Sequence, residues 1–400
     1  MLHLLNMKPA FSLLTLLLLA TVSCTSSKTI QYENVPIQRA QIELTEEQLL
    51  DVGILIFDPN LPEEDQEFIF PEIRKAEARY IPYHLKATLE DTGFWGGVWV
   101  LPEKSEAMDL IVGGRIEVSN GLKVAVRIGV WDITGREWMN KVYETTVSRS
   151  AYSQQRDYSQ DPYQSFYNKI ANDLLNIRNS LSSPELRRIS EIGDLRFAAE
   201  LVPGVYSDYL MQDEKDIFSA KRLPSENDEM MGRIQNVKER EFVLVDTLNE
   251  YYAKLYQDIS VPYENWRKLS REEMLTYEDL KRSALKRQLL GAAAILGAIA
   301  YEGNSQTSSY AKQAALYGGI EVIKSGFGMS AEAKVHKESL KELGTSFDTQ
   351  AKPLIIEIEG QTLRLTGTAQ EKFLEWRKLL KQIYTEETGF NISENSDPQD

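Results

Sequence analysis

Few side chains in this 400-residue chain are of the types that catalyse reactions through a nucleophile or bind a transition metal. Of its three histidines, His84 and His336 follow the N-terminal apolar segment, and neither stands in an arrangement that suggests a catalytic triad. The sequence contains no GxSxG, HExxH, P-loop, GxGxxG or calcium-loop motif. We therefore expect no catalytic residue, no metal site and no cofactor.

Carboxylates are the one abundant reactive group, with 60 Asp and Glu against 45 Lys and Arg. A pair of them in a cleft could hydrolyse a glycosidic bond, so a hydrolase acting on peptidoglycan or another glycan stays open as an alternative. The net charge of −15 argues against a general nucleic-acid binder, because such proteins need a basic face. We expect no nucleic-acid partner.

The only cysteine, Cys24, follows an apolar segment typical of a secretory signal. Residues 11–20 read FSLLTLLLLA, which is too short to span a bilayer, and Lys8 is the only charge before them, so Met7 could be the true start in place of Met1. The sequence TVSC at 21–24 resembles a bacterial lipobox, although Thr21 replaces the usual Leu. This resemblance implies cleavage before Cys24 and attachment of a lipid to it. Because Asp does not follow Cys24, it also implies an anchor in the outer membrane rather than the inner membrane.

Two aromatic clusters are candidates for binding a partner. The first is Phe94, Trp95 and Trp99, which lie among glycines in an expected strand. These residues either pack on the core or form an exposed patch for a partner or a glycan. The second comprises Tyr152, Tyr158 and Tyr163, in a stretch rich in Tyr, Ser and Gln. It is either a loop leading into a helix or a binding surface, because tyrosines bury a large area with little loss of entropy.

A pair of segments rich in small residues could bring two helices close together. Gly291 and Gly297 lie in the first segment, and Gly318 and Gly319 lie in the second. An intramolecular helical hairpin is one interpretation. Self-association, giving a homo-oligomer, and insertion beside the membrane are the others.

The expected architecture is α+β. We expect β-α-β plus a three-stranded meander, all packed with helices, then a mainly helical domain and a small C-terminal hairpin and helix. The expected divisions are a signal peptide at 1–23, a lipidated tether at 24–38, an α/β domain at 39–182, a helical domain at 183–348, a β-hairpin plus helix at 349–390 and a disordered tail at 391–400.

Local patterns support these divisions. In the first domain, Asn120-Gly121 between two alternating apolar runs predicts a hairpin turn, and Asp161-Pro162 predicts the start of a helix. In the helical domain, the Ser270-x-x-Glu273 pattern predicts a new helix after one at 233–259. Near the C-terminus, strands are expected on both sides of Gly360. Thr368 then caps a helix with an apolar face comprising Phe373, Trp376, Leu380 and Ile383.

Residues 53–138 resemble the N-terminal domain of the TolB translocation protein and the related CsgG curli-secretion lipoproteins. The matching positions are Asp109, Gly113, Val124, Asp132 and Gly135. The resemblance implies binding to envelope proteins and no active site, and curli-type members form rings. We therefore expect a non-enzymatic lipoprotein on the periplasmic face of the outer membrane that acts in secretion, envelope assembly or control of cell-wall synthesis. A ring-forming secretion component is a further alternative.

Overall fold

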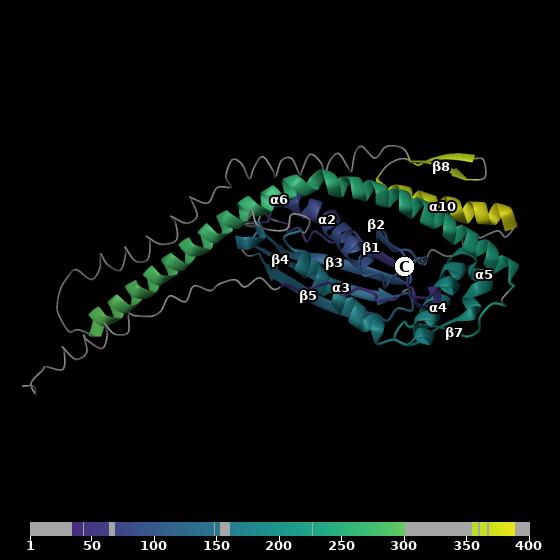
Figure 1. The fold of residues 1–400 in the computed structure, drawn as a ribbon, viewed down its shortest axis with the longest axis horizontal. Helices are drawn as coiled ribbons and strands as arrows, with labels where there is room; N and C mark the ends of the chain where they lie inside the picture. Colours follow the sequence, from purple (N-terminus) through teal and green to yellow (C-terminus); the bar gives the residue numbers. More distant parts are fainter. Residues whose placement is uncertain are drawn as a thin grey trace, which may run out of the picture. The chain divides into compact units, whose positions relative to one another are not determined.

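The computed structural model describes residues 34–42, 44–63, 69–147, 149–152, 161–225, 227–300, 354–358, 361–365 and 368–388. For 280–300 and for the two short strands between 354 and 365, the description covers the backbone alone. The architecture is α+β, as predicted (Figure 1).

A five-stranded mixed sheet forms the centre of the fold. Its strands are β1 (Val52–Leu55), β2 (Val98–Leu101), β3 (Leu110–Ser119), β4 (Lys123–Asp132) and β5 (Glu137–Thr146), in the spatial order β2-β1-β3-β4-β5. The short apolar strand β1 runs parallel to both of its neighbours, whereas β3, β4 and β5 form an antiparallel meander. The predicted order of β-α-β followed by a meander is therefore confirmed.

The hairpin turn at Asn120-Gly121 is also confirmed, and it contacts a distant helix. Gly121 has a φ of 78°, which favours glycine. A Cβ at this position would lie 2.6 Å from the Cβ of Ser270 and 2.8 Å from the carbonyl oxygen of Arg267. The turn therefore needs glycine both for its backbone conformation and for its close contact with the later helix.

Two helices cover one face of the sheet. They are α2 (Pro71–Glu90), which contains Pro82 without ending there, and α3 (Gln164–Asn179). The alternate strand residues Val52, Val112 and Val126 share one hydrophobic core with Leu85 of α2 and Ile170 of α3. Because side chains of a strand alternate between faces, this single core places both helices on the same side.

Further elements lie before the sheet and between the sheet and the long helix. They are the 3-10 helices η1 (Glu46–Gln48), η2 (Arg149–Tyr152) and η3 (Ser207–Tyr209), the helices α4 (Ser183–Leu201) and α5 (Pro203–Tyr206), and the paired strands β6 (Leu210–Gln212) and β7 (Phe218–Ala220). Helix α4 begins with a capping box in which Ser182 and Glu185 satisfy each other's backbone groups.

The long helix α6 (Glu229–Ala300) replaces the two helices that the sequence predicted. The prediction of a new helix at Ser270 is wrong, because Ser270 is buried inside α6 against the Gly121 turn. A continuous buried stripe of Ile259, Tyr263 and Trp266 carries the helix through this point. Tertiary packing of an apolar face contributes more to helix stability than a local capping signal does.

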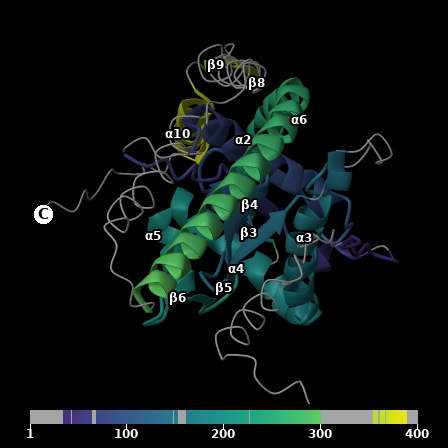
Figure 2. The ribbon, with the colours of Figure 1, turned by 90° about the vertical axis from the view of Figure 1, so that its left-hand side faces the viewer.

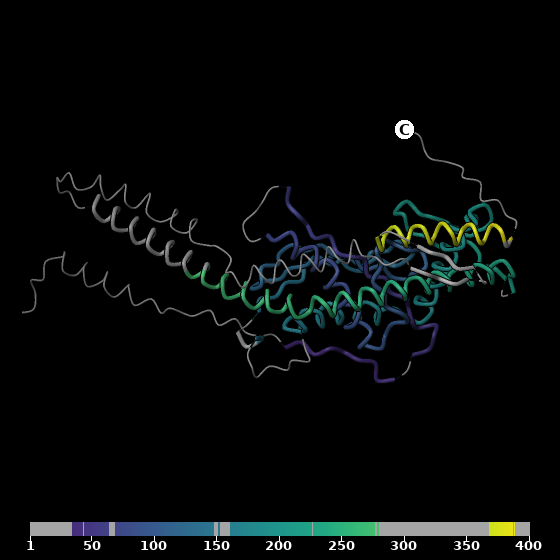
Figure 3. The backbone as a smooth tube through the Cα atoms, turned by 90° about the horizontal axis from the view of Figure 1, so that it is seen from above, coloured from purple at the N-terminus to yellow at the C-terminus, as the bar shows by residue number. Residues whose placement is uncertain are grey.

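A second core joins α6 to the C-terminal helix α10 (Ala369–Thr388), which lies beside it (Figures 1 and 3). The predicted cap is present, since Thr368 and Glu371 exchange hydrogen bonds. Phe373, Trp376 and Leu380 are buried as predicted, and the next buried residue on this face is Tyr384. The predicted hairpin before α10 is β8 (Leu354–Ile358) paired with β9 (Gln361–Leu365). None of the helices within the described ranges is long and apolar enough to cross a membrane.

Candidate functional site

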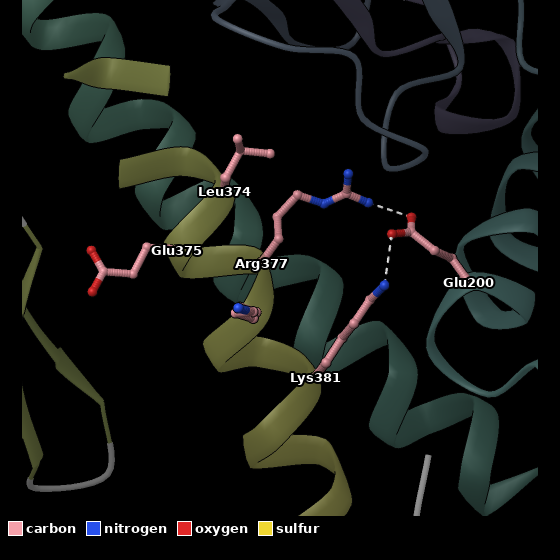
Figure 4. Close-up of a pocket in the computed structure, with 6 residues that line it drawn as sticks. Glu200, Leu374, Glu375, Arg377 and Lys381 are labelled. Atoms are coloured by element: carbon pink, nitrogen blue, oxygen red, sulfur yellow. Dashed lines mark hydrogen bonds and ion pairs between the residues drawn. The ribbon is translucent and has the colours of Figure 1, made fainter. Parts of the chain in front are cut away.

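An open pocket of about 610 Å³ lies along α10 where it faces Glu200 of α4 (Figure 4). Three cations on one side of α10 line it, together with the half-exposed Leu374. The lining residues are Glu200, Leu374, Glu375, Arg377, Lys378 and Lys381. The positions 374, 377, 378 and 381 follow the i, i+3, i+4, i+7 spacing that places residues on one face of a helix.

Ion pairs hold part of this pocket in place. In Figure 4, Arg377 and Lys381 both point towards Glu200, whereas Glu375 points away from it. The ammonium of Lys381 lies 3.2 Å from Oε1 of Glu200, and Arg377 contacts Oε2 of the same carboxylate. Arg377 Nε also lies 3.7 Å from the buried Glu241 of α6. Arg377 and Lys381 are therefore already paired with carboxylates of the chain itself.

A second group of charges lies where the parallel strands β1 and β3 begin. Asp51 precedes β1 and Asp109 precedes β3, and the N-terminal ends of neighbouring parallel strands meet at one edge. The carboxylate of Asp109 accepts hydrogen bonds from the backbone N–H of Asp51 at 2.9 Å and from Ser190 Oγ at 3.3 Å. Lys238 of α6 forms an ion pair with Asp194 of α4 at 2.9 Å. Its positive charge also lowers the pKa values of Asp51 and Asp109, against the effect of burial.

An acidic pair with a raised pKa is also what a hydrolase would need. Burial raises the pKa of Asp109 to about 6, and burial also raises the pKa of Asp51. Asp109 is only 5 % exposed, however, and its Oδ2 accepts hydrogen bonds from both a backbone N–H and a serine hydroxyl. These contacts indicate that Asp109 joins the sheet to α4 instead of facing a substrate.

The raised pKa predicts a specific dependence of stability on pH. Between pH 4 and pH 6 the folded chain keeps a proton on Asp109 that the unfolded chain releases, so ionisation of Asp109 lowers stability as pH rises. In the wild type, ionisation of Asp109 should lower the free energy of unfolding by about 2–3 kcal/mol between pH 4 and pH 7. The Asp109→Asn variant should not show this decrease. Urea unfolding across this range measures it, with Asp208→Asn, at an exposed site, as the control. Parallel curves for the wild type and Asp109→Asn would contradict this prediction.

A buried set of charged and aromatic side chains, which we call the α6 clamp, holds α6 against α2 and α3. Arg267 of α6 forms two hydrogen bonds to the carboxylate of Asp161, at 3.1 and 2.8 Å. The guanidinium also lies over the rings of Tyr163 and Tyr263, 4.9 and 4.3 Å from their centroids. Arginine suits this place because its planar group can pair with a carboxylate and stack on aromatic faces at the same time.

The clamp extends along α2 through a carboxylate and an imidazole. Glu77, which is fully buried, accepts hydrogen bonds from Tyr263 Oη at 2.7 Å and from Ser119 Oγ. His84 lies with Nδ1 2.6 Å from Tyr256 Oη and Nε2 2.8 Å from Gln164 Oε1. Burial lowers the pKa of His84, which favours the neutral imidazole that accepts one of these bonds and donates the other. The clamp thus ties α6 to both helices of the sheet domain.

On the sequence alone, Asp161 was predicted only as a helix start, and Arg267 was not singled out. Helix α3 begins three residues after Asp161, at Gln164, and the Asp161 carboxylate accepts the N–H of Tyr163 besides pairing with Arg267. Arg267 lies 106 residues further along the chain. No local pattern relates two charges at that separation, although a charge within an otherwise apolar helix stripe is a signal that could have drawn attention to Arg267.

The first aromatic cluster lies mostly within the fold. Trp95 is 6 % exposed and belongs to the core beneath α2 and α3. The ring of Trp99 lies against that of Phe242 of α6, with the centroids 4.8 Å apart, and its indole N–H donates to Asp246 at 2.7 Å. Phe94 packs against the core edge, 5.5 Å from the guanidinium of Arg178. These contacts use the rings of Trp95 and Trp99 for packing and leave no exposed patch formed by the three.

The other predicted site residues are separated. Tyr163 is buried in the α6 clamp and donates its hydroxyl to the carbonyl of Gly121, and Tyr152 ends η2 and packs at the core edge. Gly291 and Gly297 lie in the backbone of α6. Four further residues lie outside the described ranges: Cys24, Tyr158, Gly318 and Gly319.

In the part of the chain that the structure describes, no group of three or more His, Cys, Asp or Glu is placed to hold a metal ion. His336 lies outside that part. Comparisons with protein-family models, with curated proteins and with solved structures gave no match.

Proposed function

We propose that this chain is a lipid-anchored protein on the periplasmic face of the outer membrane that binds other envelope proteins without catalysing a reaction. The observation that carries the proposal is the way α6 is held. The α6 clamp and the second core fix the first part of this helix to the sheet domain. The last buried side chain described on α6 is that of Met274, and the backbone of α6 continues as a helix to Ala300 (Figure 1).

Burying an arginine, a glutamate and a histidine is expensive unless all of them are paired. In this chain the hydrogen-bonded groups lie where α6 contacts α2 and the residues that lead into α3, so they set the direction of the rest of the helix. A rigid helix directed in this way can present its far part to a partner. The pocket on α10, with the exposed Leu374 and with Lys378 in its lining, adds a second surface for a segment of a bound protein.

The location rests on Cys24 and the apolar segment before it. A lipidated cysteine would hold the chain at a membrane surface, and an anchored protein with two binding surfaces suits assembly, secretion or control of cell-wall synthesis. The resemblance of residues 53–138 to TolB and CsgG domains supports the same role, since members of those families bind envelope proteins.

Photo-crosslinking in intact cells tests this function. A photoreactive amino acid at Asp279, on the far part of α6, and another at Leu374, in the pocket, should each yield discrete adducts with envelope proteins. The same probe at Ile42, which is 76 % exposed but lies on neither surface, should not. Equal adducts at all three positions, or none at Asp279 and Leu374, would contradict the proposal. Release of soluble fragments from purified peptidoglycan by the protein would instead support the hydrolase.

A further inference from the structure

The strand β5 is the last strand at one end of the sheet, so its outer edge has no strand beside it in the described part of the chain. A groove of about 150 Å³ follows this edge. The five consecutive residues from Lys141 to Thr145 line one side of it, and Val35, Ser165, Phe166 and Lys169 line the other. The groove therefore lies beside consecutive residues of an edge strand, which is the kind of surface that strand addition uses.

One face of β5 is covered by α3, and the other face is exposed. Met139, Lys141 and Tyr143 point to the side covered by α3, where Lys141 and Tyr143 both bond to Asp173. Val142 points to the opposite side, which is open. It is 39 % exposed, and Trp131 on β4 is 37 % exposed on the same side. The free outer edge of a ten-residue strand, with an exposed valine near its middle, is a surface that proteins usually protect.

We propose that the outer edge of β5 pairs with β5 of a second copy of this chain, antiparallel across a twofold axis at Val142. In such a pair, residues directly opposite each other share a face, and their numbers add up to twice the central number. With Val142 at the axis, Val142 meets Val142, Lys141 meets Tyr143, and Asn140 meets Glu144. Met139 meets Thr145 and Trp138 meets Thr146, so the pairing uses the strand almost from end to end.

Charge complementarity favours this register over its neighbours. Centring the pair on Lys141 would place two ammonium groups opposite each other at the axis, which destabilises a sheet. Centring it on Tyr143 would place Val142 opposite Glu144. With Val142 at the axis, no like charges face each other. Lys141 lies opposite an aromatic ring, a contact that it already makes within its own chain, where its ammonium is 4.8 Å from the Tyr143 ring.

The net charge of the whole chain also favours this edge over other surfaces for a second copy. A net charge of −15 makes two copies repel each other in general. Within β5, Lys141 lies between Glu137 and Glu144, so the strand is close to neutral. Two copies therefore meet with little repulsion there. The inference is independent of the proposed function, because it needs neither the anchor nor the far part of α6.

Disulfide trapping tests both the contact and the register. Cys24 is the only cysteine in the full-length chain, so a covalent dimer that the wild type does not form must involve the introduced cysteine. In oxidised whole cells, Val142→Cys should form a covalent dimer in high yield, and the wild type should not. Asn140→Cys alone should form at least fivefold less, whereas co-expressed Asn140→Cys and Glu144→Cys chains should crosslink to each other. Absence of a Val142→Cys dimer, or equal yields from Val142→Cys and Asn140→Cys alone, would overturn the proposal.

A substitution that keeps the fold provides an independent test. Val142→Lys places two positive charges at the axis, while its half-exposed position leaves the core unchanged. In light scattering of the purified full-length chain, it should weaken self-association at least tenfold. Val142→Thr, which keeps a β-branched side chain, should not. Circular dichroism checks that both variants are folded. A monomeric wild-type chain at all concentrations, or a Val142→Lys variant that associates like the wild type, would overturn the proposal.

Discussion

Replacing Arg267 with methionine should lower the free energy of unfolding by about 3–5 kcal/mol, because it leaves Asp161 buried without its charged partner. The side chains of Arg267 and Asp161 are 1 % and 5 % exposed, so water cannot replace the lost bonds. Burial opposes ionisation of Asp161, yet the charge of Arg267 keeps its pKa below the ordinary value. Without Arg267, the folded state must hold an unpaired carboxylate or take up a proton.

The pairing of the two groups also predicts how the loss can be reversed. Asp161→Asn in the Arg267→Met background removes the unpaired charge but keeps an oxygen that can accept the N–H of Tyr163. We expect this double variant to regain at least half of the lost stability. The matched surface control is Arg267's exposed counterpart Arg187, which is 50 % exposed beside Glu47 and Glu191. Arg187→Met should change stability by less than about 0.5 kcal/mol.

Urea unfolding followed by circular dichroism measures these free energies. An Arg267→Met variant within about 1 kcal/mol of the wild type would show that the α6 clamp does not hold the helix. The Arg267→Met variant also tests the proposal that α6 presents its far part to a partner. If the clamp directs α6 towards a partner, Arg267→Met should also reduce the adducts formed by a photoreactive residue at Asp279, at a temperature where the variant is still folded.

Replacing Cys24 with serine should move the protein out of the membrane fraction or leave an uncleaved precursor. Signal peptidase II acts before a lipidated cysteine, and serine cannot carry the thioether-linked lipid. Several acyl chains anchor firmly, at about 0.8 kcal/mol per buried CH₂, so their loss should be evident without quantitative fitting. Labelling with radioactive palmitate and fractionation of the envelope measure this outcome.

The neighbouring residue provides the control for this experiment. Ser23→Ala keeps a small side chain before the cysteine, so the protein should still incorporate palmitate and remain in the membrane. Palmitate incorporation into the Cys24→Ser variant, or a cleaved Cys24→Ser chain that still fractionates with the membrane, would contradict lipidation at Cys24. Loss of labelling in Ser23→Ala as well would show that the effect comes from the signal region in general.

Local signals in the sequence were sufficient for the sheet and for the C-terminal helix. The alternation of β3 and β4 and the Asn120-Gly121 turn depend on a side-chain period of two and on a glycine conformation, which neighbouring residues determine. The cap at Thr368 and the stripe of Phe373 and Trp376 depend on the helical period in the same way. For these elements, the preferred local structure and the buried face coincide.

The tertiary structure alone decided the continuity of α6 and the candidate sites. The capping signature at Ser270 does not begin a helix, because the buried stripe of α6 continues through this residue. The stripe packs against a turn about 150 residues earlier in the chain, and local sequence patterns carry no information over that distance. Arg267 and Asp161 are two ordinary charges in the sequence, and Asp51 and Asp109 are two ordinary aspartates. Burial made the pair of Arg267 and Asp161 a structural contact that holds α6. It also raised the pKa values of Asp51 and Asp109. Burial depends on which elements meet in space, and the spacing of residues along the chain does not determine that.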